Sequence, residues 1–389
     1  MEPTIKLFVA IALIIFIYGS VNYYIGLKIW EILSRQFQIL NNKLYWPIFW
    51  FFALSYLFAR LGERIFPEGL NYVLLIIGSY WFAVMLYFFV LFIIIDLVKY
   101  FDRWLRFLPG NVRKNEKAAL IAGLGIIVLA AGTIIYGHFN ARNPVLTSYT
   151  LDIPKKAGAL EEIRAVLVSD IHLGRIIDKA RLVELVNSVN RLEPDVVLLA
   201  GDIIDEDIEP FISQNMSEAF LKLKSRFGVY GILGNHEYYG GDTEDIIKRL
   251  EASGIKILRD DYLKVAESIY IAGRDDIQVE ASEKRPRKAL AELMEGVDKS
   301  LPVILMNHRP ENLDEAKEQG VDLQLSGHTH RGQLFPINLI TGYLFECDWG
   351  YIKKDNLNVI VSSGYGTWGP PIRTGNRPEI VSISLKFKE

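Results

Sequence analysis

Residues 165–174 read AVLVSDIHLG, a short apolar run that ends directly in a polar motif. Ala165–Ser169 is apolar and partly β-branched, which favours a buried strand. Asp170 and His172 follow at once, and in an extended chain residues i and i+2 point to the same side. Both side chains can therefore reach one ion while Ile171 packs into the core. A buried strand that ends in metal-ligand side chains sets the pattern for the C-terminal half.

The same pattern recurs four more times, each time as a predicted strand followed by a polar motif. The pairs are Asp195–Ala200 with Gly201-Asp202-Ile203-Ile204-Asp205, Val229–Leu233 with Gly234-Asn235-His236-Glu237, Ser300–Met306 with Asn307-His308, and Leu323–Leu325 with Gly327-His328-Thr329-His330. Helices are expected between them at Lys179–Leu192 and Ser217–Lys224. Alternating strands and helices predict an α/β layered domain. In such sheets ligands bind beyond the carboxyl ends of the strands, so we expect the five motifs to converge on one cleft.

Five of the six histidines lie in these motifs, and histidine is the commonest metal ligand among side chains. Asp-x-His alone could be two surface polar residues, and Gly-Asp-x-x-Asp alone could be a turn with a helix cap. Together they provide seven candidate ligands: Asp170, His172, Asp202, Asn235, His308, His328 and His330. One tetrahedral site needs about four ligands, so seven suit two ions that share a carboxylate. Mixed nitrogen and oxygen ligands suit manganese, iron and zinc alike, and two such divalent ions are the expected cofactors.

The first 138 residues are far more apolar than the rest. The apolar runs are Ile5–Gly26, Tyr45–Leu61, Tyr72–Val98 and Ala118–Tyr136. A membrane-spanning helix needs about 20 mostly apolar residues. Three runs meet this length, and the second is short but carries Tyr45, Trp46 and Arg60 as interfacial anchors. A signal peptide or a soluble helical core fits less well, because further spans follow the first run and Tyr72–Ile95 has no charge. We expect an all-α membrane domain of four spans over residues 1–138 and an α/β domain over residues 139–389.

The distribution of Lys and Arg around the spans predicts their orientation. The first and third loops hold nine of these residues: Lys28, Arg35, Lys43, Lys99, Arg103, Arg106, Arg113, Lys114 and Lys117. The opposite side holds four: Lys6, Arg60, Arg64 and Arg142. This bias places the two loops in the cytoplasm and both termini outside. The protein is thus expected to be a multi-pass cell-membrane protein with an extracytoplasmic C-terminal domain, unless the short second run fails to span.

Cysteine content and charge restrict the remaining classes. The single cysteine, Cys347, excludes an internal disulfide. A net charge of −3 gives no electrostatic surface for nucleic acid, so nucleic acid is not an expected partner. The apolar runs make the lipid bilayer the expected partner. The sixth histidine, His138, follows the fourth apolar run and reads as an interfacial polar residue. Asp96 is the only acidic residue in the third run and lies near its end, which disfavours a transporter or receptor built around charges within the membrane.

The five motifs together resemble the calcineurin-like metallophosphoesterases over roughly residues 155–389. The stretches Asp170-Ile171-His172-Leu173-Gly174, Gly327-His328-Thr329-His330-Arg331-Gly332-Gln333 and Ser363-Gly364-Tyr365-Gly366 are similar to the bacterial membrane-linked branch, the transmembrane proteins with a metallophosphoesterase domain. Arg331 departs from that branch, which more often has glycine there. The resemblance implies a layered β-sandwich flanked by helices.

The resemblance also implies a role for each site residue. The first metal would be held by Asp170, His172 and His330, and the second by Asn235, His308 and His328. Asp202 would bridge the two ions, and a hydroxide between them would attack phosphorus. His236 would face the substrate, as a donor to the phosphoryl oxygen or as a general acid. Asp205 would orient His236.

The expected function is a membrane-anchored phosphoesterase that hydrolyses a phosphodiester or diphosphate in a phosphorylated lipid or envelope substrate. One alternative is a cytoplasm-facing hydrolase similar to UDP-2,3-diacylglucosamine pyrophosphatases. A second is a non-catalytic binding module on the same scaffold, which would be expected to lack ligands that are present here. Near the motifs, Arg175, Arg331 and Arg373 are phosphate-binding candidates or ordinary surface arginines. Tyr365 and Trp368 are candidates for an apolar lip of the cleft or for loop packing.

Overall fold

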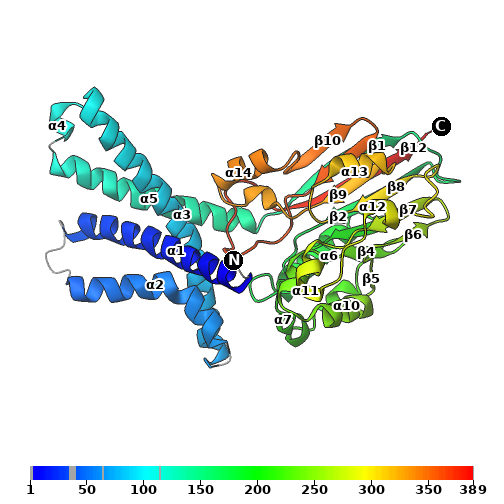
Figure 1. Ribbon diagram of the computed structural model, residues 1–389, viewed down its shortest axis with the longest axis horizontal. Helices are drawn as coiled ribbons and strands as arrows, with labels where there is room; N and C mark the ends of the chain where they lie inside the picture. Colours follow the sequence, from blue (N-terminus) through cyan, green and yellow to red (C-terminus); the bar gives the residue numbers. More distant parts are fainter. Residues whose placement is uncertain (1–2, 35–40, 64, 114, 389) are drawn as a thin grey trace. The chain divides into compact units, whose positions relative to one another are not determined.

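The computed structural model describes residues 3–34, 41–63, 65–113 and 115–388 (Figure 1). Its contacts divide the chain into two compact units. One comprises Met1–Gly137 with Gly369–Pro371, and the other comprises His138–Trp368 with Ile372–Glu389. The first unit is helical, and the second combines strands and helices.

The helical unit contains four long apolar helices, as predicted. They are α1 (Pro3–Ser34), α2 (Asn42–Gly62), α3 (Glu68–Leu105) and α5 (Glu116–Ala141), with a short α4 (Gly110–Arg113) before the last. The segments long and apolar enough to cross a membrane are Phe8–Ser34, Asn42–Gly62, Glu68–Leu105 and Lys117–Ala141. The second of these contains the short apolar run whose span was uncertain. Helical backbone of this kind pairs most of its own N–H and C=O groups, as a bilayer requires.

Side chains from all four helices pack together. Ile25, Phe49, Phe92 and Ile126 lie in one buried cluster. At Gly78 of α3 a Cβ atom would lie 2.2 Å from the backbone nitrogen of Tyr56, so this glycine allows α2 and α3 to approach closely.

A polar contact that the sequence did not suggest joins α1 to α3. Asp96 lies 2.7 Å from Lys28 Nζ and accepts a hydrogen bond of 2.7 Å from the Tyr24 hydroxyl. The pairing compensates the cost of placing an isolated carboxylate near the end of an apolar helix.

The second unit is built on two six-stranded sheets. The first sheet has the order β1-β12-β2-β3-β4-β5, and its strands are β1 (Val145–Ile153), β2 (Glu162–Val168), β3 (Val196–Ala200), β4 (Val229–Ile232), β5 (Ile255–Ile257) and β12 (Glu379–Phe387). The second has the order β10-β11-β9-β8-β7-β6, with β6 (Asp261–Val265), β7 (Ile269–Gly273), β8 (Val303–Met306), β9 (Leu323–Ser326), β10 (Gly350–Lys354) and β11 (Leu357–Val361). Both sheets are mixed, because β12–β2, β6–β7 and β10–β11 are antiparallel and their other neighbours are parallel.

The two sheets pack face to face. Leu167 and Leu198 of the first sheet share a buried cluster with Ile304 and Leu323 of the second. Along β2 the alternate residues Val166 and Val168 belong to a different cluster, on the other face of the first sheet, as the two-residue period of a strand requires. The domain is therefore the expected layered β-sandwich.

Helices cover the outer faces of the sandwich. The first sheet is covered by α6 (Lys179–Asn190), α7 (Glu209–Ser213), α8 (Ser217–Phe220) and α10 (Thr243–Ala252), and the second by α12 (Leu290–Leu293) and α13 (Leu313–Glu318). Three further short helices are α9 (His236–Tyr239), α11 (Gln278–Glu283) and α14 (Ile337–Leu344), and a 3₁₀ turn η1 covers His330–Gly332. The predicted helix Ser217–Lys224 is shorter than expected. Its last residues form i→i−3 turns, with Leu223 N–H donating to Phe220 O at 2.9 Å.

Candidate metal centre

The site forms where five strand ends meet. The chain leaves β2 at Asp170, β3 at Asp202, β4 at Asn235, β8 at His308 and β9 at His328. Strands β2, β3 and β4 are parallel neighbours in one sheet, and β8 and β9 are parallel neighbours in the other. Their carboxyl ends therefore deliver all five motifs to one edge of the sandwich.

The backbone at this edge adopts an unusual conformation. The φ angles are positive at Asp170 (51°), His172 (52°), Asp202 (49°), His328 (69°) and His330 (47°). Left-handed conformations are uncommon outside glycine and persist where surrounding structure holds them, often at functional sites. Five of the seven predicted ligands share this conformation.

Glycines allow the ligand loops to approach one another. Gly201 has a φ of +87°, and a Cβ atom there would lie 2.5 Å from His308 Nδ1. A Cβ at Gly234 would lie 2.2 Å from Asp202 Oδ1, and one at Gly327 would lie 2.2 Å from Asp170 Oδ2. These three motif glycines are required by contact with the ligand side chains themselves.

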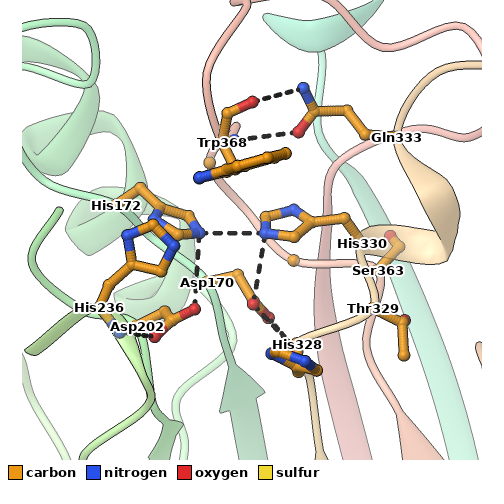
Figure 2. A network of polar contacts seen from close by, with 12 residues as sticks. Asp170, His172, Asp202, His236, His328, Thr329, His330, Gln333, Ser363 and Trp368 are labelled. Atoms are coloured by element: carbon orange, nitrogen blue, oxygen red, sulfur yellow. Dashed lines mark hydrogen bonds and ion pairs between the residues drawn. The ribbon is translucent and has the colours of Figure 1, made fainter. Parts of the chain in front are cut away.

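One group of candidate ligands consists of Asp170, His172 and His330 (Figure 2). The Nε2 atoms of His172 and His330 face each other at 3.0 Å, and His330 Nε2 lies 3.4 Å from Asp170 Oδ1. His172 Nε2 also lies 3.8 Å from Asp202 Oδ2. Asp170 accepts the backbone N–H of His328 at 3.0 Å, which ties this group to the motif that follows β9.

A second group consists of Asp202, His308 and His328. His308 Nδ1 lies 2.8 Å from the carbonyl oxygen of Ala200, so Nδ1 carries the proton and Nε2 is directed to Asp202 Oδ2 at 3.1 Å. Asn235 is 4% exposed, and its Oδ1 is buried without a hydrogen-bond partner among the described residues. Asp202 contacts imidazoles of both groups.

These residues fit a pair of divalent cations. A buried amide oxygen without a donor normally indicates a ligand or an ion. Convergent imidazole nitrogens and carboxylate oxygens are the ligand types of manganese, iron and zinc sites. Six carboxylates and imidazoles form the two groups, and Asp202 contacts imidazoles of both. With the amide oxygen of Asn235 they match the ligand number that two ions need.

The three imidazoles that follow β8 and β9 differ in their protonation. Burial opposes charge on His308, but Asp202 outweighs it and raises the pKa of His308 to about 10. Burial and the charge of His308 lower the pKa of His328 to about 3, and burial with His172 and Arg373 holds the pKa of His330 well below its usual range. His328 and His330 are therefore neutral, as metal ligation requires, whereas His308 carries a proton that a bound ion would displace.

His236 and Asp205 form a pair beside the two groups. His236 Nδ1 lies 2.9 Å from Asp205 Oδ1, and the backbone N–H of His236 donates to Asp202 Oδ1 at 2.9 Å. Asp205 Oδ1 also lies 3.3 Å from His172 Nδ1, so one carboxylate contacts both imidazoles. Burial opposes charge on His236, but Asp205 and Asp202 raise its pKa to about 9. His236 is therefore positively charged near neutral pH.

Glu237 supports the site in a way that sequence reasoning missed. Its side chain is fully buried and accepts the backbone N–H groups of Asp202 (3.1 Å), Ile203 (2.6 Å), Ile204 (2.9 Å) and Gly234 (2.7 Å). Burial, together with the nearby Asp202, raises the pKa of Glu237 to about 7. The only signal in the sequence is an acidic residue directly after His236, in a motif whose other members are candidate ligands.

The structure distinguishes among the residues proposed to contact substrate. Arg373 is not a surface arginine: it is fully buried, donates to Gly366 O at 2.7 Å and places Nη2 3.1 Å from His330 Nδ1. Arg331 lies over the Trp349 ring at 4.0 Å, and Arg175 pairs with Asp207 at 3.7 Å.

Of the two aromatic candidates, Trp368 lines the pocket, whereas Tyr365 packs against α6. Tyr365 is buried, and its hydroxyl donates to the carbonyl oxygen of Arg181 at 3.1 Å. Trp368 is 58% exposed and lies above the His172–His330 pair in Figure 2. The side-chain amide of Gln333 holds the Trp368 backbone: Nε2 donates to Trp368 O at 2.9 Å, and Oε1 accepts from the Trp368 N–H at 3.0 Å.

A pocket of about 400 Å³ opens over the site. Its polar wall includes His236, His328 and His330. Ile337 and Trp368 lie in its apolar part. The pocket thus places a histidine pair and two groups of candidate ligands next to an apolar rim.

Fold and site together define an α/β domain with a candidate dimetal centre, joined to four membrane-spanning helices. The sequence profile of calcineurin-like phosphoesterases matches residues 163–332. A metallophosphoesterase of Aquifex aeolicus is 34% identical over 65% of this chain and 96% of its own length. One of Campylobacter jejuni is 33% identical over 69% of this chain and 71% of its own length. The chain belongs to the calcineurin-like metallophosphoesterase family.

Relatives from vertebrates carry names that describe a transmembrane protein. A zebrafish (Danio rerio) protein named "Transmembrane protein with metallophosphoesterase domain" is 33% identical over 67% of this chain. The match covers 62% of the zebrafish protein, less than two thirds of its length. Similar sequences therefore occur in vertebrates as well as in bacteria.

Proposed function

We propose that the protein is a membrane-anchored, dimetal phosphoesterase of the membrane-linked branch that hydrolyses a phosphodiester or diphosphate in a lipid- or envelope-linked substrate. The observation that carries the proposal is the convergence of six carboxylate and imidazole side chains in two groups, with Asp202 in contact with an imidazole of each. Asp170, His172 and His330 would hold one ion, and Asn235, His308 and His328 the other. Manganese, iron and zinc all suit these ligands.

The residues around the ions support phosphoryl chemistry. Bound divalent cations would supply activation of water at neutral pH and neutralise charge on the phosphoryl oxygens. The protonated His236 is placed to donate to a phosphoryl oxygen or to the leaving oxygen. Asp205, 2.9 Å from His236 Nδ1, orients the imidazole and stabilises its charge.

The membrane spans and the pocket rim support the proposal of a lipid- or envelope-linked substrate. Four spans hold the site near the bilayer, which raises its effective concentration toward membrane substrates. The apolar rim beside the polar wall suits a phosphate carried on an apolar chain. A cytoplasm-facing diacylglucosamine pyrophosphatase-like activity would use the same features, and the side of the membrane decides between the two.

The test uses the full-length chain in lipid nanodiscs, with bis-p-nitrophenyl phosphate as a water-soluble diester. We expect hydrolysis that a chelator abolishes and that manganese, iron or zinc restores. Metal analysis of the active preparation should give about two ions per chain. Full activity in metal-stripped protein would contradict the proposal, and metal binding without any hydrolysis would favour a binding module instead.

A further inference from the structure

The helix α14 (Ile337–Leu344) is an apolar element on the surface of the α/β unit. Its sequence, INLITGYL, contains no charged residue. Leu339, Ile340, Tyr343 and Leu344 are 64%, 56%, 88% and 67% exposed. Burying one leucine is worth about 1.5–3 kcal/mol, so such a group is unfavourable in water. An exposed apolar patch of this kind marks an interaction site.

The helix forms part of the catalytic pocket. Ile337 and Thr341 lie one turn apart on the same face and line the pocket with His236 and His330. Thr341 Oγ1 donates to Asp348 Oδ2 at 2.7 Å, which fixes the helix in place. The exposed apolar side chains therefore sit directly outside the pocket wall.

Other apolar side chains continue this rim. Trp368 is 58% exposed and Tyr239 is 50% exposed, and both line the pocket with Ile337. Tryptophan and tyrosine are the residues that proteins place at the membrane–water interface. The rim thus has the composition of an interfacial surface.

Hydrogen bonds within the α/β unit link the same site to the end of the fourth span. Asn140 belongs to the last turn of α5, and its Nδ2 donates to Arg373 O at 2.9 Å and to Asn376 O at 2.6 Å. Arg373 Nη2 lies 3.1 Å from His330 Nδ1, and Asn376 Nδ2 donates to His330 O. A candidate metal ligand is thus separated by one residue from a helix that leaves the membrane.

We infer that α14 enters the interfacial layer of the membrane that holds the spans. There Leu339, Ile340, Tyr343 and Leu344 contact acyl chains, and the helix guides a lipid-linked phosphate into the pocket over the metal centre. The substrate class is a phosphodiester or diphosphate on an apolar chain. The occupant that we propose for the apolar face is lipid, because the rim holds Trp368 and Tyr239 and the network from His330 ends at Asn140, in the last turn of the helix that contains the fourth span. The substrate part of this inference rests on the proposed function.

Insertion is tested without any activity measurement. Leu339→Cys and the matched control Leu221→Cys are each labelled with an environment-sensitive fluorophore in full-length protein. Leu221 directly follows α8 and is 61% exposed. Both variants carry Cys347→Ala, and the protein is held in nanodiscs. We expect spin-labelled lipids to quench the label at position 339 at least fivefold more than the label at 221.

Two results would overturn the insertion. One is equal, weak quenching at both positions, which would place α14 in water. The other is a blue-shifted label at 339 that lipid does not quench, which would show that a second copy or another protein surface covers the helix.

The substrate part is tested with two esters that share a leaving group, bis-p-nitrophenyl phosphate in solution and phosphatidyl-p-nitrophenol in vesicles. Leu339→Ser with Ile340→Ser should lower the ratio of lipid to soluble turnover about tenfold, because lipid contact is lost. The matched control, Leu221→Ser with Ile212→Ser, should leave the ratio unchanged. An unchanged ratio in the α14 variant would overturn the substrate part. If the unmodified protein hydrolysed neither ester, the proposed function would be contradicted instead. The fluorescence result would still decide insertion.

Discussion

His236 and Asp202 are in contact, yet they have different proposed roles. We predict that His236→Ala lowers kcat by roughly 10²–10⁴, the range for a general acid or base, and keeps both metals. Asp202→Ala should lose metal, because this carboxylate contacts both ligand groups. Metal content and turnover of each purified variant check this. The opposite pattern, with metal lost only in His236→Ala, would invert the assignment.

The pH profile gives a second prediction for His236. Its pKa in the folded protein is raised to about 9, so the imidazole is protonated below that pH and loses its proton above it. If His236 acts as the acid, kcat should be flat between about pH 7 and 8 and fall above about pH 9. That alkaline fall should be absent from the residual activity of His236→Ala. A profile with the same alkaline limb in both proteins would assign the proton donor elsewhere.

Glu237 gives a stability prediction. Each buried N–H group that loses its acceptor costs about 1–3 kcal/mol, and Glu237 accepts four. Glu237→Ala should therefore lower the free energy of unfolding by at least about 3 kcal/mol, measured on metal-free protein in nanodiscs. The exposed Glu218 serves as control, and Glu218→Ala should cost less than about 1 kcal/mol. Equal small effects of the two substitutions would contradict the support that we assign to Glu237.

At the residue scale, the sequence predicted the candidate ligands of the site better than the buried residues that hold the ligand loops in place. Side-chain type and two-residue spacing were enough to place Asp170 and His172 together. The four N–H groups that meet Glu237 come from two different strand ends, so no local pattern could indicate them. The sequence also left open whether Arg373 binds phosphate or lies on the surface. Its burial next to His330 depends on contacts between loops far apart in the chain, which no local pattern indicates.

The loops that follow the strands are the elements that shape the site, and Gly234 tests how closely they fit. A Cβ atom at Gly234 would lie 2.2 Å from Asp202 Oδ1, whereas one at Gly174 would find its nearest neighbour at 3.5 Å. We predict that Gly234→Ala weakens metal affinity by about 10–100-fold, the usual effect of disturbing the surroundings of a ligand. Gly174→Ala should leave the affinity within about twofold. Titration with Mn²⁺ measures both, and equal affinities would show that the loop can adjust.

At the element scale, long periodic segments were predictable and short ones were not. The four apolar helices and the strands before each motif follow from composition and period. The helix α14 escaped prediction because eight residues without charges or a buried face leave no clear period. The predicted helix Ser217–Lys224 ends at Phe220, and its last residues form i→i−3 hydrogen bonds instead. Such tighter turns depend on tertiary packing.

For the whole molecule, the side of the membrane is the prediction that most restricts the substrate. The bias of Lys and Arg predicts four spans with the α/β domain outside. A fusion after Glu389 should then show active alkaline phosphatase and dark green fluorescent protein. A fluorescent fusion would place the site in the cytoplasm and favour the diacylglucosamine pyrophosphatase-like alternative.

The hydrogen bonds of Asn140 have a mechanical consequence. The fourth span, Lys117–Ala141, has 25 residues. At about 1.5 Å per residue it is roughly 37 Å long, against a hydrocarbon core of about 30 Å, so it must tilt to match the bilayer. Asn140 connects this tilt to Arg373 and Asn376, and through them to His330. Turnover of the soluble diester should therefore vary with lipid acyl length in nanodiscs, and less so in Asn140→Ala. Equal turnover at every acyl length would contradict this coupling; if it holds, membrane thickness becomes a control on the phosphoesterase.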